Sequence, residues 1–597
     1  MSRLAVYVFW ERDGIVRDYV ITYLVGLTAV ADKLYVVVNG KIQPEGRQKI
    51  EKETGAIVLQ RPNEGVDFWA YKTGLDHEGG GISTYDEVIL CNCSCYGPVY
   101  PFTEMFEEMG KRDVDFWGIT EWPLNAGGYQ GTWVLSYFLV FRPHLFLSPE
   151  WVYYWKNLSP VRSRDECIEK HETKFTGYFA EKGFTYDVYC PSSPGYLDPT
   201  IEAPDELVID QRCPVIKRKA FCSDYGRFLP YRKGDASRRV FDYVKEHHLY
   251  DTDQILMDML ATQHMAYLRD CLQLYYILPD HGANAARSTR RAVICFQMSC
   301  EELLDENFQT LRGLPSLVDC YIMAPGTLLK SVREKVVAYG VQNCTIGESI
   351  GFAGAIGALL RVSDQLENYD CVCALHDGHA VDLTAHCVNA ESRRFATHAL
   401  LASPGYIGQV LEQFDREPHL GLLSPVNSLH GPYSNRYGQE WGMNYANTVT
   451  LLQWADVDVP ISETIAPIAP LSGMFWFRPA ALKRLLELGI KEDEFTVGNE
   501  DGTLYHAVLR SLPYFAQSAG YLSGEIIPVS ATANHLVNLS YLYRQDNLAL
   551  CGSANMTYVP VEVCIGVRGA LKIYLKRHLP IGLTSLLSRI YHHLRGK

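Results

Sequence analysis

The sequence carries the same short patterns twice and in the same order, with the second set beginning about 285 residues after the first. Repetition on this scale predicts two copies of one α/β domain, so a functional group found in one copy can be sought in the other. The matching segments are Leu4–Phe9 with Arg291–Phe296, Tyr85–Cys95 with Tyr369–His379, and Ser136–Pro143 with Ser472–Pro479.

Within each copy, short apolar runs alternate with segments of helical character. For example, a helix is predicted near Pro44–Thr54, between strands at Lys33–Val38 and Ala56–Leu59. This alternation is typical of βαβ units and a largely parallel sheet, which makes the predicted fold class α/β. We place the copies at 1–205 and 288–530, a mostly helical connector at 206–287, and a C-terminal segment at 531–597.

Composition narrows the class of protein. The chain has 597 residues, 47% of them hydrophobic, and a formal net charge of −14, which argues against a nucleic-acid partner. Its start reads as a β-strand rather than a signal peptide, and no apolar run reaches the 18 or more residues of a spanning helix. The 17 cysteines then indicate free thiols in a reducing cytoplasm.

The C-terminal segment differs from the acidic remainder of the chain. Cys564–Lys597 contains Lys and Arg but no Asp or Glu, interleaved with Leu, Ile and Tyr, and Pro580 should divide it into two short amphipathic helices. Such helices suit the surface of an anionic membrane. The alternative is a helix that packs on its own protein and leaves a basic face in solvent.

In the second copy, polar residues follow a predicted strand at His376–His379. Ligands of open α/β sheets bind outside the carboxyl ends of the strands. Asp377, with His379, is therefore predicted to hold Mn²⁺ or Mg²⁺ against a diphosphate. The alternative is a turn capped by Asp377, with the histidines in solvent.

Two further groups of polar residues precede predicted helices. Glu500 and Asp501 could accept a proton from an attacking hydroxyl, or could simply cap a helix. Asn63 and Asp67, in a glycine-containing turn of the first copy, could contact a nucleotide, or Asp67 could be an ordinary helix cap.

Neither copy keeps all of these groups. Cys93 stands in the first copy where the second has Asp377, and Gly351 stands in the second copy where the first has Asp67. Each copy has therefore lost one polar group that the other retains.

Seven further motifs are distributed over both copies and the connector: Asn63–Lys72, Cys95–Pro98, Asp115–Glu121, Ser136–Arg142, Pro214–Lys219, Gly473–Pro479 and Asp501–Thr503. Together they resemble the motifs of the rhamnan synthesis protein F family, bacterial glycosyltransferases that build rhamnose-containing cell-wall polysaccharides. Two segments depart from the family's pattern. The family's usual Asn-Asp-Ser is here Asn92-Cys93-Ser94, and a His-Thr-Lys type segment is here His376-Asp377-Gly378.

The resemblance implies two GT-A-like (Rossmann-like) domains at the cytoplasmic face of the cell membrane. It also implies a nucleotide-sugar donor, dTDP-L-rhamnose, and an acceptor glycan carried on undecaprenyl diphosphate. By likeness to inverting GT-A enzymes, Asp501 or Glu500 would be the base in the second copy, and Glu169 or Glu172 in the first. The residues assigned to donor binding are Asn63, Asp67, Asp377, Arg142 and Arg478.

These expectations define an inverting glycosyltransferase of polysaccharide synthesis. One rival is an enzyme that transfers another deoxyhexose, or glucose, with the same machinery. The other is a glycan-binding or scaffolding protein in which one or both copies are inactive.

Overall fold

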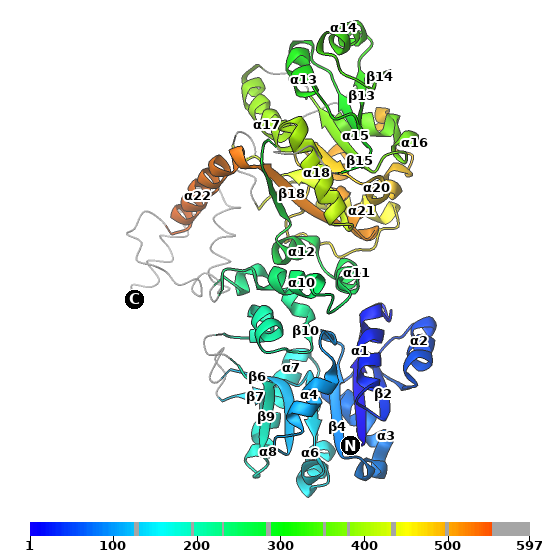
Figure 1. Ribbon diagram of the computed structural model, residues 1–597, viewed down its shortest axis with the longest axis vertical. Helices are drawn as coiled ribbons and strands as arrows, with labels where there is room; N and C mark the ends of the chain where they lie inside the picture. Colours follow the sequence, from blue (N-terminus) through cyan, green and yellow to red (C-terminus); the bar gives the residue numbers. More distant parts are fainter. Residues whose placement is uncertain are drawn as a thin grey trace, which may run out of the picture.

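The computed structural model describes residues 1–123, 131–192, 196–229, 232–281, 288–349, 354–378, 383–430, 438–495 and 501–551. Its two large sheets lie one after the other along the chain, with helices of the connector between them (Figure 1). The chain is mixed α/β, as the alternation of apolar runs predicts.

The first sheet is parallel in its first part and antiparallel around β8. Parallel pairing joins β3, β2, β1 and β4, whereas β8 runs antiparallel to both β4 and β6, and β9 joins β6 in parallel. In spatial order the strands are β3 (Ile57–Arg61), β2 (Lys33–Asn39), β1 (Arg3–Phe9), β4 (Glu87–Asn92), β8 (Phe138–Phe141), β6 (Phe116–Trp122) and β7 (Trp133–Val134), with β9 (Tyr186–Cys190) beside β6.

The second sheet repeats the order and directions of β3, β2, β1, β4, β8, β6 and β9. Among the described strands it has no counterpart of β7, and it ends instead on β11, which runs parallel to β18. β17 takes the antiparallel place of β8, and β18 joins β16 in parallel as β9 joins β6. In spatial order the strands are β14 (Cys344–Glu348), β13 (Val318–Ala324), β12 (Ala292–Gln297), β15 (Cys371–His376), β17 (Phe475–Phe477), β16 (Leu420–Pro425), β18 (Leu522–Pro528) and β11 (Tyr275–Leu278). The repetition seen in the sequence is thus present in the strand order of the sheets.

Helices cover both faces of the first sheet, which explains why its central strands β1, β2 and β4 are buried along almost their whole length. Alternate residues of β1 enter different clusters, because successive side chains of a strand point to opposite faces. Tyr7 packs with α1 (Asp18–Thr28) and α4 (Phe102–Met109). Val6 packs on the other face with α3 (Val66–Glu78) and α8 (Thr173–Ala180).

The chain between the two large sheets contains helices and two short strands. One of these strands forms a separate two-stranded sheet, and the other joins the second large sheet. The helices are α10 (Ala236–Glu246), α11 (Thr252–Thr262) and α12 (Met265–Leu272). β10 (Ile216–Lys217) pairs with β5 (Cys95–Tyr96), and β11 is an edge strand of the second sheet.

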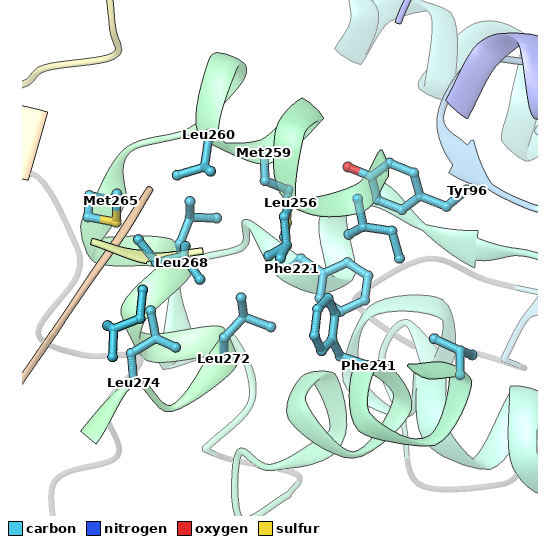
Figure 2. Packing of buried hydrophobic residues seen from close by; sticks show 14 of the residues in the cluster. Tyr96, Phe221, Phe241, Leu256, Met259, Leu260, Met265, Leu268, Leu272 and Leu274 are labelled. Atoms are coloured by element: carbon cyan, nitrogen blue, oxygen red, sulfur yellow. The ribbon is translucent and has the colours of Figure 1, made fainter. Parts of the chain in front are cut away.

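One apolar cluster links the connector to the first part of the chain. Figure 2 shows Tyr96 beside the connector residues Phe221, Phe241, Leu256 and Met259. Because this cluster also includes buried residues of the second sheet, the connector packs against both parts of the chain rather than separating them.

The last described helix, α22 (Val529–Cys551), leaves the second sheet after β18. Large apolar side chains are exposed along it, including Leu536 (57% exposed), Val537 (63%) and Tyr543 (70%). The basic stretch Cys564–Lys597 lies outside the described residues. Within the described ranges, no helix is long and apolar enough to cross a bilayer.

Candidate functional site

A cleft of about 2050 Å³ opens at the carboxyl edge of the first sheet, and we call it the main cleft. Trp10, Asn39, Arg61 and Asn92 line it, and they stand at or just beyond the ends of β1, β2, β3 and β4. The chain order of the sheet reverses between β1 and β4, so the main cleft lies where open α/β sheets bind their ligands.

Asp67 enters the main cleft from the first turn of α3. A left-handed turn at Gly65 (φ 75°) starts this helix, and a Cβ at Gly65 would lie 2.3 Å from the Trp69 ring. Asn92 at the end of β4 donates a hydrogen bond of 3.0 Å to the Asp67 carboxylate. Asn63 is exposed in the preceding loop and lines the same cleft.

The pKa of Asp67 is raised to about 6, first by burial and then by the negative charge of Glu172. Arg164, Lys217 and the hydrogen bond from Asn92 oppose this rise but do not cancel it. The two carboxylates therefore share one electrostatic environment inside the main cleft, and Asp67 titrates close to neutral pH.

Glu172 lies at the end of a short π-helical turn, η3 (Ile168–Glu172), directly before α8. Its carboxylate lines the main cleft and accepts a long hydrogen bond of 3.4 Å from the Ser136 amide. Glu169, the other first-copy candidate, is exposed and is not part of the cleft wall. The structure thus brings Asn63, Asp67 and Glu172 together and leaves Glu169 apart.

The connector contributes to the main cleft a cation, Lys217, that the sequence motifs alone do not assign to a site. Lys217 of β10 donates a 3.1 Å hydrogen bond to the Ser94 hydroxyl, and its ammonium lies 4.0 Å from the centre of the Tyr137 ring. Ser94 in turn donates to Asn92 at 2.6 Å. The motif Pro214–Lys219, which contains Lys217, was the sequence feature that could have pointed to this residue. Its position beside β4, however, depends on the pairing of β10 with β5.

Asp377, which follows β15, is buried and points toward the loop that follows β12. Its carboxylate accepts hydrogen bonds from the Ser299 amide (2.9 Å), the Cys300 amide (3.1 Å) and the Asn307 side chain (3.2 Å). The side chain is almost enclosed, and burial raises its pKa to about 6 even though these donors lower it.

Cys93 has the matching place in the first copy. Its sulfur accepts from the Trp10 amide at 3.4 Å and donates to the Trp10 carbonyl at 3.5 Å. Cys93 therefore holds the residue that follows β1, and Asp377 holds the loop that follows β12, the equivalent strand of the second sheet.

The described residues around Asp377 do not fit a metal site. The oxygens of Asp377 already bind protein donors, and His379 lies outside the described residues. Across the described ranges, no group of three or more His, Cys, Asp or Glu is arranged to hold a metal ion.

Asp501 lies in the second copy before α21 (Leu504–Ser518) and away from the main cleft. It accepts hydrogen bonds from Asn444 (2.5 Å) and the Met443 amide (3.1 Å), and Arg510 lies 3.6 Å away. Burial alone would raise the pKa of Asp501, but these donors and Arg510 lower it overall. Glu500 lies outside the described residues.

Arg142 and Arg478 occupy equivalent positions directly after β8 and β17, at the sheet edges opposite the carboxyl ends of the parallel strands. Arg142 donates to the carbonyls of Met109 (2.8 Å), Arg112 (2.6 Å) and Val114 (2.9 Å). Arg478 likewise donates to the carbonyls that follow α18 (Pro404–Arg416) and to that of Phe414 within it. The structure therefore places neither arginine at the main cleft, and both tie a helix end to the antiparallel strand.

Comparison with protein families decides the affiliation. The model of the family described as rhamnan synthesis protein F matches residues 34–521, which is most of the chain. The protein belongs to the rhamnan synthesis protein F family. The resemblance found in the sequence motifs is thereby confirmed, whereas no curated protein is significantly similar in sequence.

Solved structures resemble this rhamnan synthesis protein F family member only distantly. The glycosyltransferase GlyE of Streptococcus pneumoniae TIGR4 is 12% identical over 65% of this chain and 88% of its own, with a TM-score of 0.21. Core-mannan synthase A of Aspergillus fumigatus, in a Mn/GDP form, is 8% identical over 26% of this chain, with a TM-score of 0.19. This chain covers 63% of that protein, less than two thirds of its length.

Proposed function

We propose that this protein is an inverting glycosyltransferase whose donor site is the main cleft. The donor would be a nucleotide-linked deoxyhexose, dTDP-L-rhamnose, and the acceptor a glycan carried on undecaprenyl diphosphate. The observation that carries the proposal is the pair of electrostatically coupled carboxylates, Asp67 and Glu172, at the switch point of a sheet in a rhamnan synthesis protein F chain.

The two carboxylates would have different tasks. Glu172, whose carboxylate accepts a single long hydrogen bond, would take the proton from the acceptor hydroxyl as its oxygen attacks the anomeric carbon. The bond from that carbon to the diphosphate would break as the new glycosidic bond forms. Asp67 and Asn63 would orient the donor sugar or its nucleotide.

Basic side chains would stabilise the departing diphosphate. Lys217, Arg164 and Arg61 all line the main cleft, and fixed cations near a developing negative charge lower the barrier to its departure. No step of this proposal runs through a metal ion, and addition of Mn²⁺ or Mg²⁺ remains an experimental variable.

In the second copy, Asp501 stays the proposed base. Its low pKa would keep it ionised, although hydrogen bonds from Asn444 and Met443 make the carboxylate less basic. The proposal for the main cleft does not depend on turnover in the second copy.

We further propose that the protein acts in the cytoplasm on the inner surface of the cell membrane. The exposed apolar residues of α22 and the basic stretch Cys564–Lys597 support this, because apolar and basic groups together favour an anionic lipid surface. Because α22 begins directly after β18, this arrangement would place the membrane beside the second copy.

Donor screening by thermal unfolding tests the proposal. A ligand that binds the folded state raises the unfolding temperature, so dTDP-L-rhamnose should stabilise the protein more than other nucleotide sugars. The screen is run with and without Mn²⁺, and the variant Lys217→Met should lose most of the shift. A donor shift that is equal in the parent and in Lys217→Met would place the donor elsewhere.

A further inference from the structure

The main cleft is larger than a nucleotide sugar requires. Sites for small ligands usually measure about 300–1,000 Å³, whereas this cleft has a volume of about 2050 Å³. Its additional walls come from α11 of the connector and from the second copy, where Asp456, Asp458 and Gln517 face it. The space beyond Asp67 is therefore bounded by three separate parts of the chain.

An exposed tryptophan stands on the wall of this additional space. Trp10, the first residue after β1, is 47% exposed and lines the main cleft. Its backbone is fixed on both sides by the Cys93 thiol. This contact gives the cysteine at position 93 a structural task in place of the carboxylate found in the second copy.

Two more exposed apolar side chains line the same cleft. Ile15 is 46% exposed on the loop before α1, and Met257 is 48% exposed on α11. Scattered apolar residues on a surface mean little, but apolar residues gathered in one cleft mark a binding site.

Carboxylates of the second copy form another part of the rim. Asp456 and Asp458 follow α19 (Tyr445–Trp454), and both are exposed. Asp458 lies 3.9 Å from Arg12 of the first copy, with side chains that are 93% and 86% exposed. Such an exposed ion pair contributes little to stability, so the Asp458 oxygens can accept hydrogen bonds from a ligand.

We propose that Trp10 and Asp458 form a subsite for a pyranose ring of the acceptor glycan. A pyranose presents C–H groups on its faces and hydroxyls at its edge. The faces pack on an aromatic ring, and the hydroxyls donate to a carboxylate. A 6-deoxyhexose has a methyl group where a hexose has a hydroxymethyl group, and this methyl suits the apolar wall formed by Ile15 and Met257.

The proposal of this subsite rests on the proposed function, because that function identifies the ligand as a glycan. With the donor at Asp67, a glycan on Trp10 would lie in the same cleft and present its end to Glu172. The second copy would then take part in acceptor recognition through Asp458, whether or not it catalyses transfer itself.

Direct binding of L-rhamnose oligosaccharides tests the subsite without requiring turnover. The probes contain one, three or six rhamnose residues, and titration calorimetry on the full chain measures the Kd. We expect the parent to bind the longer probes more tightly than rhamnose. Trp10→Ala should weaken binding of the six-residue probe about tenfold, Trp10→Phe should weaken it less, and Asp458→Asn about threefold.

Trp454→Ala is the matched control, because Trp454 is 59% exposed in the second copy but is not part of the cleft wall. Equal Kd values for Trp10→Ala and Trp454→Ala would overturn the subsite, as would a parent that binds no probe. If the parent transfers no sugar yet binds the probes through Trp10, the proposed function fails and the subsite stands.

Discussion

Replacing Asp67 with asparagine tests whether the buried negative charge of Asp67 lowers the free energy of unfolding. The pKa of Asp67 is about 6 in the folded protein, whereas an aspartate in an unfolded chain has a pKa of about 3.9. Between these values the folded state binds more protons than the unfolded state. The free energy of unfolding therefore falls as the pH rises from about 4 to about 6 and stays low above that range.

The size of the effect follows from the same shift. A pKa difference of about 2 corresponds to about 3 kcal/mol above pH 7, which partial access of solvent from the cleft reduces to about 2 kcal/mol. The introduced asparagine has no charge to bury, and its side-chain oxygen can still accept the hydrogen bond from Asn92. Asp67→Asn should therefore stabilise the protein by about 2 kcal/mol at pH 8, and by about 0.5 kcal/mol or less at pH 4.

Thermal unfolding at several pH values measures this difference. For a folding unit of 150–250 residues, about 2 kcal/mol corresponds to a rise of about 4–8 °C at pH 8. Asp76→Asn is the control, since Asp76 lies on the same helix but is exposed and paired with Lys72 at 2.7 Å; its change should stay within about 0.5 kcal/mol. A variant Asp67→Asn that is less stable than the parent at pH 8 would refute the reasoning, because Asp67 would then be a stabilising ion-pair partner.

Three further expectations follow from the placement of the other residues. Arg142→Gln, and equally Arg478→Gln, should lower the free energy of unfolding by about 3 kcal/mol by leaving buried carbonyls without donors, and chemical denaturation of both variants checks this. Both variants should bind the donor with the affinity of the parent. A loss of donor affinity would indicate that these arginines contact the donor after all. Deletion of residues 552–597 should reduce co-sedimentation with vesicles that contain anionic lipid but not with neutral vesicles. Equal binding by the truncated chain and the parent would show that the basic segment does not bind the membrane. Asp501→Asn should lower transfer about 10²- to 10⁴-fold if the second copy catalyses a step, and an unchanged rate in steady-state assays would confine turnover to the first copy.

Local signals explain how much of the fold was predictable. The helix predicted near Pro44–Thr54 has those bounds in the structure, because proline starts it and Gly55 ends it in a left-handed conformation. The central strands β1, β2, β12 and β15 were evident from apolar runs that are buried on both faces. β10 and β11 were not predicted, because such short segments become strands only when β5 and β18 pair with them.

Residues of the candidate site could be predicted from the sequence only where the position of a residue along a strand or helix decides whether its side chain reaches the main cleft. Asp67 and Glu172 reach the main cleft because each stands at the start or end of a helix beside the carboxyl edge of the sheet. Asp377 also stands at a strand end, but its carboxylate accepts hydrogen bonds from the amides of Ser299 and Cys300. A local sequence pattern does not reveal this direction, because these amides belong to a distant segment of the chain. Lys217 was missed because it arrives from the connector, through a pairing between distant parts of the chain.

The most direct measurement is the rate of rhamnose transfer from labelled dTDP-L-rhamnose to a lipid-linked glycan by Glu172→Gln, compared with Glu169→Gln. Removing a general base lowers a rate about 10²- to 10⁴-fold, so Glu172→Gln should fall by that factor and Glu169→Gln should match the parent. Equal rates for the two variants would show that the main cleft does not carry out the chemistry.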